Sequence, residues 1–148
     1  MTVTIQEGHS DIEVLIKCPE ATEDIRKIET LLYDINLGIE KRLACSKDGL
    51  TCFISRRDIL YFESVDKRCY LYTAADVYEV AFKLYELEEL LTDVDFIRSS
   101  KSQIINMAKI ESLCPDFGGR IETTMSNGEK LIVSRQYAKT LKERLGIR

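Results

Sequence analysis

Residues 96–106 are Phe96-Ile97-Arg98-Ser99-Ser100-Lys101-Ser102-Gln103-Ile104-Ile105-Asn106, and the prediction of the fold starts from them. Apolar runs stand on both sides of a polar centre whose only charges, Arg98 and Lys101, are basic. Because a half-buried strand keeps its alternation of apolar and polar residues throughout, the break predicts a strand, an exposed basic turn over 98–102 and a buried strand ending at Asn106. Two interpretations of the turn stay open. It could contact nucleic acid through hydroxyls beside a cation, or it could be a plain solvated turn.

Short strands are expected on both sides of this stretch. The predicted strands are 43–46, 50–55, 59–65, 69–73, 77–82, 109–113, 120–125 and 130–133. Asp48-Gly49 and Asn127-Gly128 indicate hairpins, and the Asn-Gly pair predicts a two-residue turn with positive φ at both positions. Apolar spacing predicts one short helix over 84–91 and a last helix over 135–145. No pair of helices has the short turn of a helix-turn-helix, so any DNA contact must come from loops or strand ends.

The first 42 residues predict a separate β-β-α unit. Its strands are expected at Val3–Gln6 and Ile12–Lys17, with Pro19 ending the second. A helix follows Thr22, and its apolar residues recur at three- and four-residue spacing, namely Ile25, Ile28, Leu31, Leu32, Ile35 and Ile39. So small a unit needs a partner surface, either residues 43–148 of its own chain or a second copy.

Composition excludes several classes of protein. The chain has 148 residues, of which 45% are hydrophobic, as in a globular domain. No apolar run is long enough for a membrane helix and no signal peptide is evident, so we expect a cytoplasmic protein. Five cysteines without a Cys-x-x-Cys pair, and a single histidine, predict no metal site, no disulfide framework and no Ser-His or Cys-His catalysis. Phosphate-binding glycine loops are also missing. We therefore expect a protein that is not an enzyme and that binds no cofactor and no small-molecule substrate.

The net charge of −4 is unevenly distributed. Residues 1–45 carry much of the negative charge, and seven acids against one base lie between Asp76 and Asp95. The rest of residues 46–148 is therefore basic, and one face of an acidic molecule can still bind a polyanion.

The combined motifs resemble the LytTR family of bacterial DNA-binding domains. The motifs, in chain order, are Asp58-Ile59-Leu60-Tyr61-Phe62-Glu63-Ser64, Phe96-Ile97-Arg98-Ser99-Ser100-Lys101-Ser102, Asn106, Asn127-Gly128 and Val133-Ser134-Arg135. The similarity spans about residues 44–146 of the chain. It implies a LytTR-like antiparallel β sandwich, here over 43–148. It also implies a transcription regulator whose loops enter successive major grooves and which binds paired repeat sites as a homodimer.

The resemblance carries the family's contact positions onto three segments. They correspond to Lys67, Arg68 and Cys69 in one turn, Ser100 and Lys101 in the second, and Arg135 at the start of the last helix. Where the family commonly has His-Arg, this chain has Ser100-Lys101, which keeps a cation but loses the bidentate guanidinium. Asn106 is expected to order the backbone rather than to touch DNA.

The N-terminal unit is too short for the phosphoreceiver that many relatives carry. By resemblance to stand-alone members, we expect the unit to dimerise or to dock a small membrane protein that restrains the regulator. Two other hypotheses stay open here. The acidic pI of about 5.2 and the Ser100-Lys101 departure would suit a ligand- or protein-binding regulatory module without DNA binding. A thiol-based sensor rests on Cys69 alone.

Overall fold

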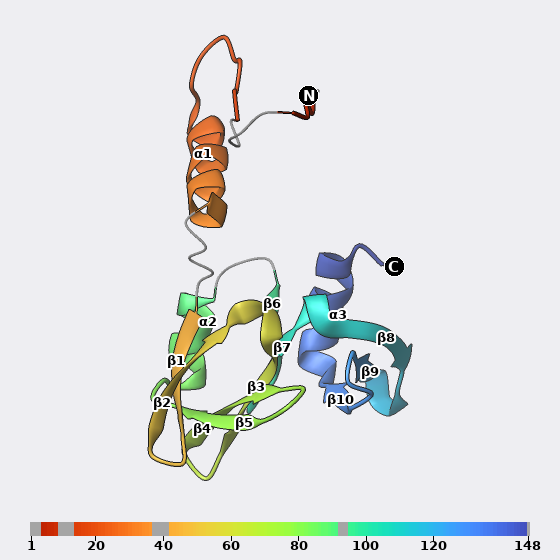
Figure 1. Ribbon diagram of the computed structural model, residues 1–148. Helices are drawn as coiled ribbons and strands as arrows, with labels where there is room; N and C mark the ends of the chain where they lie inside the picture. The colour runs from red at the N-terminus through yellow and green to blue at the C-terminus, as the bar shows by residue number, and fades with distance from the viewer. Residues whose placement is uncertain (1–3, 9–13, 37–41, 92–94, 148) are drawn as a thin grey trace. The chain divides into compact units, whose positions relative to one another are not determined.

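The computed structural model describes residues 4–8, 14–36, 42–91 and 95–147. By its internal contacts the chain divides into two units, Met1–Ile39 and Glu40–Arg148. The first unit holds α1 (Glu23–Asn36). The second holds, in order (Figure 1), β1 (Arg42–Lys47), β2 (Leu50–Ser55), β3 (Ile59–Val65), β4 (Arg68–Thr73), β5 (Val77–Val80), α2 (Leu84–Leu90), β6 (Phe96–Ser100), β7 (Gln103–Asn106), β8 (Ile110–Pro115), β9 (Ile121–Met125), β10 (Lys130–Val133) and α3 (Arg135–Leu145). No helix within the described ranges has the length and apolarity that a membrane crossing requires.

The second unit is a mostly-β fold of two antiparallel sheets, which confirms the predicted fold class. The larger sheet has seven strands in the order β2-β1-β5-β4-β3-β7-β6, and the smaller has three in the order β10-β9-β8. Figure 1 shows α2 on one side of β6 and β7, and α3 with the smaller sheet on the other. The predicted strands and both helices of this unit are all present, and none of their ends differs from the prediction by more than three residues.

Strand β3 is the centre of the unit, because it is buried on both faces. Its first four residues, Ile59 to Phe62, are all 5% exposed or less. A bulge between Ile59 and Tyr61 interrupts the pairing with β4. Leu60 and Tyr61 therefore both contribute to one hydrophobic cluster, while Ile59 and Phe62 contribute to the other. A continuous apolar run, rather than alternation, is what a strand buried on both faces requires.

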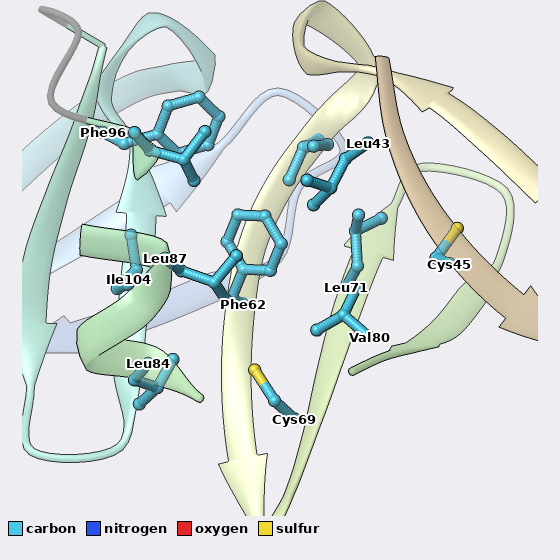
Figure 2. Packing of buried hydrophobic residues seen from close by; sticks show 12 residues of the cluster. Leu43, Cys45, Phe62, Cys69, Leu71, Val80, Leu84, Leu87, Phe96 and Ile104 are labelled. Carbon is cyan, nitrogen blue, oxygen red and sulfur yellow. The ribbon is translucent and has the colours of Figure 1, made fainter. Parts of the chain in front are cut away.

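The two hydrophobic clusters lie on opposite faces of the larger sheet. The first packs α2 onto the sheet, and Figure 2 shows Leu87 of that helix beside Phe62 and Ile104. The rings of Phe62 and Phe96 meet there with their centroids 6.0 Å apart. The second cluster joins the larger sheet to β9, β10 and α3 through residues such as Ile121 and Leu141. Both ends of the polar hairpin 96–106 are thereby anchored in packed core.

The structure of the N-terminal unit differs in part from the predicted β-β-α arrangement. Helix α1 forms as expected, but residues 4–8 and 14–18 carry no strand, while Val3, Ile12 and Ile39 of the predicted elements lie outside the described residues. An isolated two-stranded hairpin is marginal in water unless a packed face supports it. Here Ile5, Val14 and Leu15 are 84%, 58% and 71% exposed, so no such face supports the pair.

The connection between β9 and β10 also differs from the prediction. The strands pair up to Thr124 and Lys130, and of Asn127 and Gly128 only the glycine has a positive φ, 86°. Met125 N–H donates to the carbonyl of Glu129, and Gly128 N–H donates to the carbonyl of Met125. This is the pattern of a three-residue loop with a left-handed glycine, which also fits a right-twisted hairpin.

Candidate nucleic-acid interface

The β6–β7 hairpin contains the polar centre of residues 96–106, but its turn is shorter than predicted. Strand β6 continues to Ser100 and β7 begins at Gln103, so Lys101 and Ser102 alone form the turn. Ser99 is fully buried, and its hydroxyl donates to the side chain and the backbone carbonyl of Gln103, at 3.0 and 3.2 Å. The expected exposed turn over 98–102 is therefore wrong for Arg98 and Ser99, because β6 continues through both of them to Ser100.

The end of β3 is hydrogen-bonded to this turn. Ser64 N–H donates to the carbonyl of Ser102 over 2.8 Å. That bond places the adjoining β3–β4 turn, Asp66-Lys67, next to the β6–β7 turn. Lys67 and Lys101 consequently line the same surface hollow. The structure thus brings together two of the three segments predicted to contact DNA.

The start of α3 is tied to the same hairpin. Ser134 N–H donates to the carbonyl of Ser99 over 2.8 Å, and Arg135 follows immediately with its side chain exposed. The stem of Arg135 lies across Gly119, where an added Cβ would come 3.3 Å from its Cγ. Gly119 has a φ of 81°, so both its conformation and the arginine stem favour glycine there. All three predicted segments are therefore connected through residues 96–106.

The side chain of Arg98 fixes the shape of the β6–β7 turn through hydrogen bonds to its backbone. Its Nε donates to the carbonyl of Ser100 at 2.8 Å, and its Nη2 donates to the carbonyl of Lys101. Its Nη1 lies 3.2 Å from a carboxylate oxygen of Glu88 on α2, and the Arg98 side chain is only 19% exposed. A planar guanidinium can satisfy these three acceptors together, whereas a lysine ammonium cannot match the fork. We infer that Arg98 positions the turn rather than contacting DNA.

Arg98→Lys should lower DNA affinity while leaving the salt dependence of binding unchanged. The lysine keeps the charge but frees the turn, so binding must order at least one more side chain, which costs about 0.5–1.5 kcal/mol. The measurement is the affinity for a fixed duplex over a salt series, with Glu88→Gln as the milder control. If the slope of the salt series fell by one, Arg98 would itself neutralise a phosphate and the positioning role would be incorrect.

Two further predicted contact residues, Arg68 and Cys69, lie on β4 rather than in the β3–β4 turn. Arg68 begins β4, and its Nε is 3.9 Å from Glu79 on β5, with both side chains exposed. Cys69 is only 5% exposed, and Figure 2 shows its thiol on the side of β4 that faces the first cluster. The period-two alternation of a strand turns Cys69 inward when its neighbours face outward. Cys69 therefore belongs to β4 and not to the turn in which the resemblance placed it, and it is among the residues that line the hollow.

Burial makes Cys69 a poor sensor. It raises the pKa of the thiol to about 11, against the weaker opposing effects of the Tyr70 backbone and of Arg98. A rise of about two pKa units leaves roughly a hundredfold less thiolate near neutral pH. Iodoacetamide should therefore label Cys69 far more slowly than the exposed Cys18 and Cys114, as peptide mass spectrometry would measure. Equal labelling rates would restore the hypothesis of a thiol-based sensor.

The same pKa shift has a consequence for stability. The raised pKa means that the unfolded chain ionises this thiol first. The free energy of unfolding should fall as the pH rises from about 9 to about 11.

The β3–β4 turn holds two non-glycine residues in the left-handed region. Asp66 has a φ of 50° and Lys67 a φ of 66°, whereas the β1–β2 turn uses Asp48 and Gly49 in the same two places. A left-handed conformation costs an L-residue roughly 1–2 kcal/mol compared with glycine, partly offset by the greater freedom of glycine in the unfolded chain. Such a strained position is a reason to look for function at Lys67.

Lys67→Gly should weaken DNA binding without destabilising the fold. We expect the free energy of unfolding to stay constant or rise by up to about 1 kcal/mol, while affinity falls evenly for all sequences because a phosphate contact is lost. Chemical denaturation and binding to several unrelated duplexes would measure both. Asp66→Gly is the matched control, since it relieves the same strain and keeps the lysine. Equal affinity of Lys67→Gly and Asp66→Gly for DNA would remove Lys67 from the interface.

Asn106 orders the backbone, in agreement with its predicted role. It is 2% exposed, and its Nδ2 donates to the carbonyl of Ile59 at 2.8 Å. Its Oδ1 accepts from Ala108 N–H at 3.0 Å. The side chain therefore ties the end of β7 to the start of β3 and is not available to DNA.

Sequence reasoning missed Lys83, which precedes α2 and lines the same hollow as Lys67 and Lys101. In the sequence it is the lone base among seven acids and resembles a solvated helix flank. Its positive charge among these acids was the one feature of the sequence that could have marked it as a candidate site residue. Lys83 lies close to the two turns only because α2 packs against the sheet.

Comparison with known proteins supports a specific family. The model of the LytTr DNA-binding domain family matches residues 49–146. An uncharacterized HTH-type transcriptional regulator of Staphylococcus aureus (strain MSSA476) is 35% identical over 132 residues, which are 89% of this chain and 88% of the relative. The sensory transduction protein LytT of Bacillus subtilis (strain 168) is 33% identical over 108 residues, 73% of this chain and 45% of that protein.

A solved structure gives the same result. The LytTr DNA-binding domain of a Bacillus cereus protein described as a methyl-accepting/DNA response regulator matches with a TM-score of 0.68 at 27% identity. The match covers 72% of this chain and 97% of that domain. The relatives named above include an HTH-type regulator, yet in residues 42–91 and 95–147 no two helices follow one another across a short turn.

Proposed function

The chain belongs to the LytTr DNA-binding domain family, a non-enzymatic regulator fold, and on that premise we propose that it binds repeated DNA sites as a homodimer to regulate transcription. DNA-binding transcription regulation follows from the family. The dimer, the repeated sites and the residues that touch DNA are the proposal. Such a regulator acts where the chromosome is, so we also propose a cytoplasmic location.

The observation that carries the proposed interface is the hydrogen bonding around residues 96–106. Ser64 and Ser134 each donate a backbone N–H to this hairpin, at 2.8 Å in both cases. These bonds hold the β3–β4 turn, the β6–β7 turn and the start of α3 in fixed relation. We propose that Lys67, Lys101 and Arg135 contact DNA from these segments, with Ser100 and Arg68 at the margin. Loops that are fixed on a rigid sheet lose little conformational entropy when they bind.

The N-terminal unit supports the homodimer. Within α1, Ile28 and Leu31 are 39% and 60% exposed, on the apolar side of an amphipathic helix. The similarity to the Staphylococcus aureus regulator extends over 132 residues, more than the second unit contains, so part of the first unit is shared. We propose that two copies of α1 pair through this side. A small membrane protein that docks on the same helix is the alternative occupant.

Selection of bound duplexes from a genomic library tests this proposal. A homodimer should recover two copies of a half-site whose centres are separated by about 10 base pairs or a multiple, since both contact surfaces then meet the same side of the duplex. Leu31→Glu should abolish the preference for paired sites and shift sedimentation to the monomer. Recovery of single, unpaired sites by a monomeric protein would contradict the homodimer and leave DNA binding itself intact.

A further inference from the structure

A hollow of about 400 Å³ lies between the two turns and the start of α2. Its lining residues are Ser64, Lys67, Cys69, Phe82, Lys83, Leu84, Tyr85, Arg98, Lys101 and Ser102. Cys69 and Leu84 are nearly fully buried and form its apolar part. The hollow is open to solvent, so a group of a larger molecule can reach it from outside.

The charge in the hollow has a single sign. Lys67, Lys83 and Lys101 are exposed at it, and no acidic side chain is among the lining residues. The fourth cation, Arg98, is turned to Glu88 and to two backbone carbonyls. Three exposed lysines around one hollow give it a positive potential, which favours an anion there.

Hydroxyl groups complete a site for an oxyanion. The hydroxyls of Ser100 and Ser102 lie 3.4 Å apart at the rim of the turn, and Ser64 lines the cavity with Ser102. A phosphate group offers several oxygens, which can accept from hydroxyls and lysine ammonium groups together. A carboxylate carries a single negative charge on two oxygens, so it balances three lysines less fully than a phosphate group does.

We propose that this hollow binds a phosphate group and that Lys83 is one of its three cationic contacts. The phosphate could belong to the DNA backbone or to a free phosphorylated small molecule. The first source rests on the proposed function, because Lys67 and Lys101 then face the duplex, and Lys83 extends that contact to α2. In the second, Lys83 contacts only the small molecule, which would compete with DNA for Lys67 and Lys101 and so act as an effector.

The test compares Lys83→Gln with Lys130→Gln in the full chain. Lys130 is an exposed lysine of β10 that pairs with Glu122, outside the hollow, and serves as the matched control. For a DNA phosphate, Lys83→Gln should reduce the slope of log affinity against log salt by about 0.9 on a mixed-sequence duplex, and Lys130→Gln should not. Lys83→Arg, which keeps the charge, should restore the slope.

Pyrophosphate, titrated into the DNA-free chain and followed by backbone amide NMR, tests the other source. A free-phosphate site predicts shifts at Ser64, Lys101 and Ser102 that disappear in Lys83→Gln, with the DNA slope unchanged. Unchanged slopes together with no pyrophosphate response would overturn the inference, as would an equal loss of slope in Lys130→Gln. If the wild-type chain bound no DNA, the proposed function would fail, and the pyrophosphate titration alone would decide the hollow.

Discussion

Arg135→Ala should lower the affinity for a selected duplex by about 1–3 kcal/mol, which is roughly 5- to 150-fold. Arg135 is exposed at the first position of α3, and its stem lies across Gly119. A guanidinium can bind the O6 and N7 atoms of guanine through two parallel hydrogen bonds. Its loss should therefore relax the preference at one base position as well as weaken binding.

Lys139→Ala is the control for Arg135. It removes an exposed cation one turn further along α3, where it pairs with Glu143 at 3.9 Å. Binding to the selected duplex and to duplexes changed at single positions would measure both effects. Wild-type affinity in Arg135→Ala, or an equal loss in Lys139→Ala, would show that the start of α3 does not read bases.

Phe62→Ala should destabilise the second unit by about 3–5 kcal/mol. Phe62 is fully buried in β3, packs against Leu87 and Phe96, and stands two residues from Ser64, which bonds to the β6–β7 turn. Domains of this size are stable by only about 5–15 kcal/mol, so the variant would lose a large part of its stability. Urea denaturation followed by circular dichroism would measure the change.

Phe62→Leu tests whether volume is the cause. It keeps most of the apolar side chain in the same cluster, so its cost should be clearly smaller than that of the alanine variant. Folded Phe62→Leu should bind DNA as the wild type does, because it leaves the turns untouched. Equal destabilisation by alanine and leucine would mean that an effect other than the cavity dominates at this position.

Most of the second unit could be predicted from the sequence because local signals agreed with the tertiary structure. The run Ile59 to Phe62 indicated a buried strand, and Asp48-Gly49 a hairpin, and both are present. The resemblance predicted three segments that contact DNA, and the structure places Lys67 and Lys101 of two of them at one hollow. Agreement of pattern, turn chemistry and packing is what specifies a fold.

The remaining features depend on packing that no local pattern encodes. Arg98 looks like part of a polar turn, but it is half-buried and bonds to Glu88 on α2 and to two carbonyls of the turn. Lys83 looks like a solvated flank, but α2 brings it to the two turns. At the N-terminus, alternation suggested strands that have no packed face to stabilise them.

The central claim is that these fixed turns bind the DNA backbone, and the salt dependence of affinity tests it most directly. Each neutralised phosphate contributes about −0.9 to the slope of log affinity against log salt concentration. Three or more cations from the hairpin turns and α3 predict a slope of about −3 or steeper for the full chain on its selected duplex. A slope near zero, or no binding at low salt, would contradict the account.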